Sequence, residues 1–236
     1  MARPDNRKPD QLRATVLERR FNPYAEGSCL IRSGGTLVHC TASVEAGVPG
    51  FRKGTGTGWV TAEYSMLPRA TSERTNRERN GASGRTQEIQ RLIGRSLRAA
   101  MQTFEFGEYT IKVDCDVLVA DGGTRCASIT GGCLALHDAC QWLAERTGQM
   151  SPFGRLVAAI SVGKVAGEHM LDLAYLEDRD AEVDANVVML APDSFVEVQG
   201  TGEHGTFDRK ELDSLLDLAK SGLDELFNLQ RAAIAG

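Results

Sequence analysis

Apolar residues recur along the chain at two spacings, every second position and every third or fourth position. The first spacing predicts strands with one buried face, and the second predicts amphipathic helices. In the first 150 residues we expect strands within 28–46, on both sides of a turn at Gly34–Gly35, and at 59–64 and 109–119. Helices are expected at 86–104 and 128–146. The polar segment from Arg69 to Gly84 is predicted to be a long exposed loop.

Residues 150–154 are typical of a junction, and a second set of elements follows them. Strand-like runs are expected at 156–165, 169–176, 186–191 and 195–199, with an acidic stretch at 177–184. The last helix is predicted to begin at Asp208, because Glu211 stands three residues later as its capping-box partner. Short strands joined by hairpins and interleaved with helices favour an α+β or mixed-sheet fold over a doubly wound one.

Composition places the chain among ordinary globular proteins. Of its 236 residues, 42% are hydrophobic and 25% are charged, and no run approaches the roughly 18 apolar residues that span a bilayer. The basic N-terminus has no apolar segment behind it, so we expect no secretory signal, no membrane partner and a cytoplasmic location. Six cysteines without C-x-x-C spacing predict buried thiols and neither a zinc site nor a redox pair.

The formal net charge of −5 conceals a large asymmetry. Residues 1–100 carry 17 basic and 9 acidic side chains, whereas residues 101–236 carry 10 basic and 23 acidic ones. Between positions 69 and 98 there are no lysines, three glutamates and eight arginines, at 69, 74, 77, 79, 85, 91, 95 and 98. Arginine forms paired hydrogen bonds with phosphates, so this segment is typical of a polyanion-binding surface. A solvated face or a set of internal ion pairs is the alternative.

A second candidate site is the turn Asp121-Gly-Gly-Thr-Arg125, between an alternating strand and a helix. Two glycines let the backbone approach a ligand closely, and amides at a helix N-terminus favour an anion. Thr124 and Arg125 add a hydroxyl and a guanidinium. These features suit one small anion, while a tight strand-to-helix turn with a solvated arginine is the alternative.

Carboxylates form the third candidate site. In an extended chain, one side of the acidic stretch would carry Asp178, Asp180, Glu182 and Asp184. So many carboxylates together are costly without a cation, and their oxygens suit Mg²⁺ or Mn²⁺, although an exposed acidic turn is possible. A loop for a nucleic-acid backbone, a loop for one anion and carboxylates for a metal together indicate phosphoryl transfer.

Five motifs make the interpretation more specific. They are Lys53-Gly-Thr-Gly-Thr-Gly-Trp59, Ala62-Glu-Tyr-Ser-Met-Leu-Pro-Arg69, Gly84-Arg-Thr-Gln-Glu-Ile-Gln-Arg91, Asp121-Gly-Gly-Thr-Arg125 and Val196-Glu-Val-Gln-Gly-Thr201. In this order they resemble the motifs of the ribonuclease PH family, and the resemblance extends from about Arg3 to the final helix. The family consists of phosphate-dependent 3′-to-5′ exoribonucleases, also called tRNA nucleotidyltransferases, which trim the 3′ ends of tRNA precursors.

The resemblance implies roles for individual residues. Inorganic phosphate, the co-substrate, is implied to bind Arg85, Gly123, Thr124 and Arg125. The catalytic residues, which are also the ligands of a divalent metal (Mg²⁺ or Mn²⁺), are implied to be Asp178 and Asp184. The RNA strand is implied to follow three arginines of the basic segment, Arg69, Arg74 and Arg77.

The implied fold has two parts: a βαβ arrangement like that of ribosomal protein S5 domain 2 over residues 1–150, and a smaller ribonuclease PH-type α/β domain over residues 151–236. Family members assemble as a ring, a trimer of dimers, so a homo-oligomer is expected. The expected reaction transfers terminal nucleotides of RNA to phosphate, releases nucleoside diphosphates, and also runs in reverse. Two alternatives stay open: a non-catalytic RNA-binding ring subunit, and a metal-dependent hydrolytic nuclease that would release monophosphates.

Overall fold

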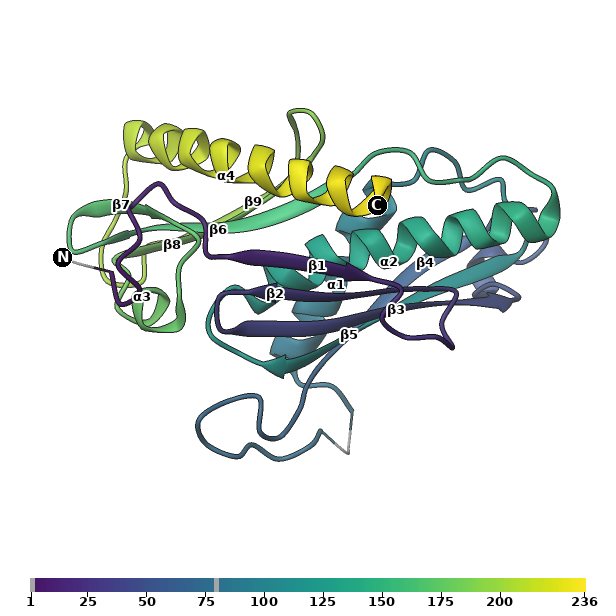
Figure 1. Cartoon of the computed structure of the whole chain (residues 1–236), viewed down its shortest axis with the longest axis horizontal. Coiled ribbons are helices and arrows are strands. Elements are labelled where there is room, and N and C mark those ends of the chain that lie inside the picture. Colours follow the sequence, from purple (N-terminus) through teal and green to yellow (C-terminus); the bar gives the residue numbers. More distant parts are fainter. Residues whose placement is uncertain (1–2, 79–80) are drawn as a thin grey trace.

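The computed structural model describes residues 3–78 and 81–236, and the first half of the chain forms a five-stranded sheet of order β1-β2-β3-β5-β4 (Figure 1). Its strands are β1 (Thr15–Arg19), β2 (Gly27–Ser33), β3 (Thr36–Ala46), β4 (Trp59–Met66) and β5 (Tyr109–Val119). Neighbouring strands are antiparallel except β4 and β5, which are parallel because helix α1 (Gly84–Ala99) returns the chain between them. Helix α2 (Thr124–Thr147) follows β5 and packs on β2 and β3.

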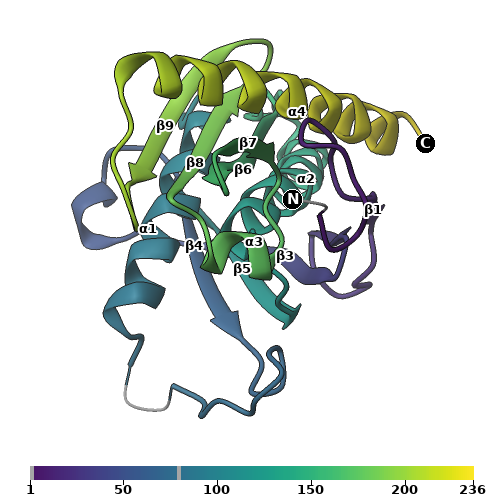
Figure 2. The same ribbon diagram turned by 90° about the vertical axis from the view of Figure 1, so that its left-hand side faces the viewer.

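The second half of the chain forms an antiparallel sheet of order β7-β6-β8-β9. Its strands are β6 (Val157–Val165), β7 (Glu168–Leu171), β8 (Val183–Leu190) and β9 (Ser194–Thr201). The short helix α3 (Tyr175–Arg179) joins β7 to β8. The long helix α4 (Arg209–Ala235) lies across the outer side of this sheet, as Figure 2 shows.

The central strands of the second sheet, β6 and β8, are buried on both faces, and alternate residues of β6 belong to different cores. Val157 and Ala159 join the core that the first sheet forms with α1 and α2. Ala158 and Ile160 join a second core with the apolar stripe of α4. This double burial explains why residues 156–165 form an almost continuous apolar run instead of alternating with polar residues.

The N-terminal segment crosses from one sheet to the other before β1 begins. The backbone amide of Leu171, at the end of β7, donates a hydrogen bond to the carbonyl of Pro9 (2.7 Å). Arg3 is buried, and its Nε donates to Glu177 Oε1 of α3 (2.7 Å). Residues 3–13 therefore pack against the second sheet, although they precede the strands of the first.

The structure confirms the expected mixed α+β fold, and most predicted elements are present. β5 has the predicted bounds and alternation. Asp208 caps α4 in a reciprocal box with Glu211, and all six cysteines are buried and free. Among the described residues no helix is both long and apolar enough to cross a membrane.

The helix ends differ from the predictions. α2 begins at Thr124 and not at 128, because Gly123 adopts a left-handed conformation (φ 66°) and is the N-cap residue. α1 ends at Ala99 and not at 104, because the carbonyl of Ala100 accepts hydrogen bonds from the amides of residues 154 and 155. The run at 169–176 is a strand only to Leu171, after which α3 forms.

The contact between β2 and α2 leaves no room for a side chain at Gly27. A Cβ atom there would lie 2.0 Å from the carbonyl oxygen of Ala135 and 2.7 Å from the amide of Ala139. Because both neighbours are helix backbone, Gly27→Ala should force the helix away from the sheet and destabilise the fold by about 3 kcal/mol. For a chain of this size we expect the Tm in thermal unfolding to fall by roughly 6–12 °C.

Gly50→Ala is the matched control, since a Cβ at Gly50 would have no neighbour within 4 Å. Its Tm should stay within about 2 °C of the wild type, as for most surface substitutions. Equal Tm values for the two variants would show that β2 and α2 are not in such close contact.

Candidate active site

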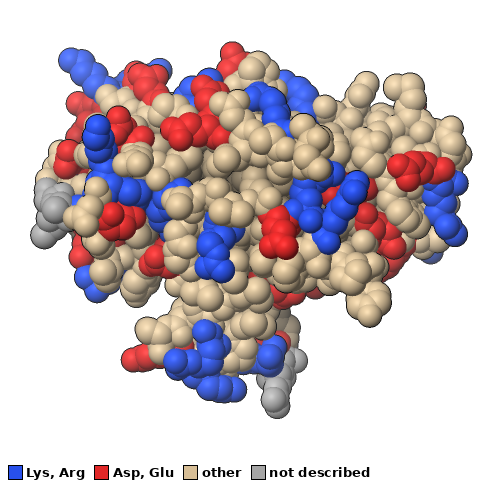
Figure 3. All heavy atoms as spheres, viewed as in Figure 1, with Lys and Arg blue, Asp and Glu red and all other residues tan. Residues whose placement is uncertain are grey.

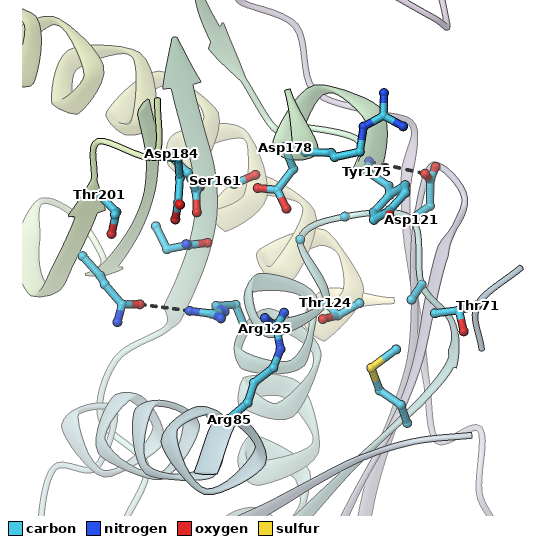
Figure 4. Close-up of a pocket in the computed structure, with 18 of the residues that line it drawn as sticks. Thr71, Arg85, Asp121, Thr124, Arg125, Ser161, Tyr175, Asp178, Asp184 and Thr201 are labelled. Carbon is cyan, nitrogen blue, oxygen red and sulfur yellow. Dashed lines mark hydrogen bonds between the residues drawn. The ribbon is translucent and has the colours of Figure 1, made fainter. Parts of the chain in front are cut away.

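A cavity of about 970 Å³ opens between the two sheets, at the N-terminal ends of α1 and α2. Helix α3 and strands β8 and β9 complete its walls. The structure brings together in this cavity all the residues predicted for the phosphate and the metal: Arg85, Gly123, Thr124, Arg125, Asp178 and Asp184. Figure 4 shows their labelled side chains around one space, with the two carboxylates on one side and the two arginines on the other.

The first turn of α2 lines the cavity with backbone amides. Gly122 and Gly123 have left-handed φ values of 75° and 66°, which turn the chain from β5 directly into the helix. Gly123 has no side chain to cap the helix, so the first amides of α2 remain available for a ligand. Together with the helix dipole, they supply the donors that the predicted anion site requires, one turn closer to the loop than predicted.

Side chains from β9 and α1 hold Arg125 in place. Its Nη1 donates a hydrogen bond to Gln199 Oε1 (3.0 Å), and Glu88 Oε1 lies 3.8 Å from the same nitrogen. The Gln199 Nε2 group donates in turn to Glu88 Oε1 (3.4 Å). One edge of the guanidinium is thereby fixed, and its other donors remain for an anion.

The hydroxyl of Thr124 forms a hydrogen bond with the phenol of Tyr64. The two hydroxyl oxygens lie 2.9 Å apart, and Tyr64 is buried in β4. Burial raises the pKa of Tyr64, so the phenol is neutral at physiological pH. The neutral hydroxyl orients Thr124 without adding a negative charge next to the anion site.

Asp178 of α3 and Asp184 of β8 face the cavity from the side opposite the arginines (Figure 4). Burial raises the pKa of Asp178, while the positive charges of Arg125 and Arg85 oppose this rise. Burial, reinforced by the negative charge of Asp178, raises the pKa of Asp184 to about 6. The negative charge of Asp178 therefore acts on Asp184, which lies on the same side of the cavity.

The predicted arrangement of the acidic stretch was wrong for its two middle residues. Because Asp178 lies in a helix and Asp184 in a strand, the stretch is not extended and its carboxylates do not share one side. Asp180 pairs with Arg179 (2.7 Å) and is exposed. Glu182 accepts a hydrogen bond from the amide of Gly167 (2.8 Å), away from the cavity.

The two remaining carboxylates fit a hard divalent cation. Asp184 Oδ1 is buried and has no hydrogen-bond partner among the described residues, as expected of an atom whose partner is a ligand. Residues 3–78 and 81–236 contain no group of three or more His, Cys, Asp or Glu side chains placed to hold a metal. Mg²⁺ is commonly held by one or two carboxylates, with water and substrate phosphates as the other ligands. The donor set therefore suits Mg²⁺ or Mn²⁺ and not a closed structural site.

The three arginines predicted to guide RNA lie outside the cavity. Arg69, Arg74 and Arg77 are exposed on the loop between β4 and α1, which protrudes from the molecule with a group of basic side chains (Figure 3). The same loop reaches the cavity through Thr71 and Ser72. Arg79 lies outside the described residues.

Two further arginines of the basic segment have structural partners, as in the alternative that the sequence left open. Arg95 pairs with Glu197 of β9 (2.8 Å). Arg98 donates to the carbonyl of Val60 (3.0 Å), and its guanidinium lies 4.7 Å from the ring centre of Trp59. These side chains fasten α1 to its neighbours.

Several residues of the site were not identified from the sequence. Glu88 and Gln199 lie inside two of the quoted motifs, and that location was their only signal. Ser161 lies in none of the quoted motifs, and Thr201 is the last residue of the motif that contains Gln199. Their place in the site depends on how β6 and β9 pack, which no local pattern reports.

Comparison with known proteins gives the same family for both halves of the chain. Domain 1 of the 3′ exoribonuclease family matches residues 11–140, and domain 2 matches residues 155–222. A protein of Frankia casuarinae named ribonuclease PH is 56% identical over 238 residues, which cover 100% of this chain and 95% of that protein.

Solved structures show the same fold at lower identity. Rice (Oryza sativa) Rrp46 is similar with a TM-score of 0.79 and 22% identity, over 99% of this chain and 100% of that chain. A chain of the Archaeoglobus fulgidus exosome, solved with RNA bound to its active site, has a TM-score of 0.80 and 22% identity. That likeness covers 95% of this chain and 91% of the exosome chain.

The anchoring of Arg125 generates a prediction about anion affinity. Gln199→Leu removes the acceptor that fixes Nη1, so the guanidinium should sample orientations that do not contact the anion. We expect the Kd for inorganic phosphate, measured by isothermal titration calorimetry, to rise about tenfold, or about 1.4 kcal/mol. Gln149→Leu, at an exposed position beyond the end of α2, should leave the Kd unchanged. Equal Kd values for both variants would contradict the anchoring role.

Proposed function

The chain belongs to the 3′ exoribonuclease family, as a phosphate-dependent 3′-to-5′ exoribonuclease, and we propose that it trims the 3′ ends of tRNA precursors in the cavity between its two sheets. The observation that carries the proposal is the presence in one cavity of two arginines, a glycine-led helix N-terminus and two coupled carboxylates. The arginines and the helix N-terminus can bind an anionic nucleophile, while the carboxylates can bind a cation that neutralises the charge of the phosphodiester.

Inorganic phosphate is the nucleophile of the proposed reaction. Arg85 and Arg125 bind its oxygens, and the amides of Gly123 and Thr124 donate to it from the helix N-terminus. Holding the phosphate between fixed donors replaces the water that it loses, and it orients one oxygen toward the RNA. The support for this arrangement is the set of donors on one wall of the cavity.

The reaction exchanges one phosphorus–oxygen bond for another. An oxygen of the bound phosphate attacks the phosphorus of the last phosphodiester, and the bond from that phosphorus to the 3′ oxygen of the preceding nucleotide breaks. The shortened RNA gains a 3′ hydroxyl, whose proton comes from the attacking hydrogen phosphate, and the terminal nucleotide leaves as a nucleoside diphosphate. Because the bond formed and the bond broken are similar in energy, nucleotide addition from diphosphates also proceeds.

Asp178 and Asp184 would hold a divalent cation, which supplies neutralisation of the negative charge on the reacting phosphates. Without such a cation, the two carboxylates would repel both the phosphodiester and the bound phosphate. Their position opposite the arginines gives the cavity two walls of opposite charge.

The arginines of the protruding loop, Arg69, Arg74 and Arg77, contact the RNA backbone upstream of the 3′ end. Their exposure and the absence of acidic partners within salt-bridge distance among the described residues support this role. Contacts of this kind are electrostatic and independent of sequence, so they weaken as salt rises. A tRNA precursor is long enough to bridge the loop and the cavity.

The proposed assembly is a homo-oligomeric ring, a trimer of dimers, in the cytoplasm, where tRNA precursors are processed. Exposed apolar side chains beside both sheets, such as Phe21, Tyr24 and Phe195, are available for contacts between subunits. A ring would place several protruding loops around a common RNA path.

Product analysis tests the proposed function. Incubation of a tRNA precursor with the protein and Mg²⁺ should release nucleoside diphosphates, at a rate that rises with phosphate concentration and saturates. Chromatography of the nucleotides distinguishes the alternatives: release of monophosphates at a rate independent of phosphate would indicate hydrolysis, and no release would indicate a non-catalytic RNA-binding subunit. Either outcome would falsify phosphorolysis here.

The two anion sites should respond differently to substitution. Arg125→Ala removes a phosphate ligand, so phosphorolytic kcat/KM should fall by at least about 100-fold while the Kd for RNA changes little. Arg74→Ala removes a backbone contact, so it should weaken RNA binding several-fold and reduce the salt dependence of the Kd. Filter binding over a range of salt concentrations and steady-state kinetics measure both. Equal losses of RNA affinity in the two variants would argue against separate sites.

A further inference from the structure

Arg13 precedes β1 and lies beneath residues 121–125, which we call the anion loop. The proposed reaction assigns it no role. Its side chain is buried, with 3% exposure, and it is not among the residues that line the cavity. Nη1 donates a hydrogen bond to the carbonyl of Asp121 (2.6 Å), and the carbonyl of Gly122 lies 3.5 Å from the same nitrogen. Arg13 therefore holds the backbone of the anion loop from the side away from the ligand.

Asp172, at the end of β7, fixes the guanidinium in this position. Its Oδ1 accepts from Arg13 Nη2 (2.7 Å), and its Oδ2 accepts from Arg13 Nε (3.1 Å) and from the Arg13 amide (2.9 Å). Asp172 itself has a left-handed φ of 54°, which is uncommon for a non-glycine residue, although aspartate adopts it more readily than most. Three hydrogen bonds therefore hold the side chain and the amide of Arg13 against one carboxylate.

The same contact joins the anion loop to the segment that leads to Asp178. The amide of Asp172 donates to the carbonyl of Ser161 (2.7 Å), and the next amide, that of Leu173, donates to Ser161 Oγ (3.0 Å). A Cβ at Gly122 would lie 2.7 Å from the carbonyl oxygen of Leu173. The backbone at Gly122 therefore contacts the backbone at Leu173, where the two walls of the cavity meet. Arg13 bridges the same two segments, because it binds both the carbonyl of Asp121 and the carboxylate of Asp172.

We propose that Arg13, held by Asp172, is a positioning residue of the phosphorolytic site. Arg13 fixes the carbonyl of Asp121, and the hydroxyl of Thr36 donates to the next carbonyl, that of Gly122 (2.7 Å). By fixing the backbone just before the helix, Arg13 sets the direction in which the amides of Gly123 and Thr124 face the phosphate. It also sets the distance between that phosphate and Asp178. The proposal rests on the proposed function, since it concerns the phosphate of that reaction, and it assigns Arg13 no contact with substrate.

Arg19 provides a matched control, because it is a half-buried arginine with the same types of partner far from the cavity. It pairs with Asp138, and it donates to the backbone carbonyls of Ala233 (2.7 Å) and Ile234 (3.1 Å) in α4. Arg19→Gln and Arg13→Gln each remove one guanidinium that bridges an aspartate and two carbonyls. Both variants should lose thermal stability, but Arg13→Gln alone should disturb the site.

The test compares wild type, Arg13→Gln, Arg13→Lys and Arg19→Gln as full chains in the phosphate-dependent assay, with RNA affinity and Tm measured on the same samples. We expect Arg13→Gln to raise the KM for phosphate about tenfold or more, with the Kd for RNA unchanged. Arg13→Lys keeps the charge opposite Asp172 but cannot bridge the carbonyls, so its KM should lie between those of wild type and Arg13→Gln. Arg19→Gln should keep the wild-type KM.

Two failures can be told apart in this assay. A wild type whose turnover does not depend on phosphate would overturn the proposed function and this inference with it. A phosphate-dependent wild type, together with an unchanged KM in Arg13→Gln, would overturn the inference alone. If Arg13→Gln does not fold, Arg13→Lys decides in the same way, and a wild-type KM in that variant contradicts the positioning role.

Discussion

The close backbone contact between the anion loop and the segment before α3 is the constraint on which the site depends. At Gly122 no side chain fits, because a Cβ would meet the Leu173 carbonyl at 2.7 Å and the Tyr175 amide at 2.8 Å. Asp121 on one side of this glycine accepts a hydrogen bond from the Tyr175 amide (3.4 Å). The arginines belong to helices α1 and α2 of the first half of the chain, and the carboxylates belong to α3 and β8 of the second half. This contact joins the two halves beside the cavity.

Buried ion pairs stabilise the same junction. They show that some arginines of the first half of the chain have a structural role and not a role in binding RNA. Arg3, Arg7 and Arg13 of the N-terminal segment pair with acidic groups of the second sheet and its connection, at Asp172 and Glu177. Burial acts to raise the pKa of Glu177, but hydrogen bonds from Arg3 and the Ala174 amide outweigh it and lower that pKa. Removing one partner from the Arg3–Glu177 pair or the Arg13–Asp172 pair would leave a buried charge without a partner. The free energy lost in this way is larger than the net stabilisation gained when the pair forms. The strong positive balance of the first 100 residues is therefore partly structural.

The sequence was sufficient to predict elements whose signal is local. The alternation of β5, the glycine turn after it and the capping box at Asp208 each depend on neighbours within a few residues. The six residues assigned to phosphate and metal through the family resemblance line one cavity. What could not be predicted depends on tertiary contacts. Asp180 and Glu182 leave the cavity because α3 interrupts the acidic stretch, and Arg95 and Arg98 are engaged because β9 and Trp59 lie beside α1. The roles of Arg13 and Gln199 could not be predicted, because each depends on partners that are distant in the sequence.

The central claim is that one cavity holds phosphate on the α2 side and a divalent cation on the opposite side. Crystals of the protein grown with phosphate and Mn²⁺ test it most directly, through the anomalous scattering of manganese and the difference density of the anion. The account predicts manganese bound by Asp178 and Asp184, and phosphate at the first turn of α2 in contact with Arg85 and Arg125. Phosphate found only on the protruding arginine loop, or manganese bound elsewhere, would contradict it.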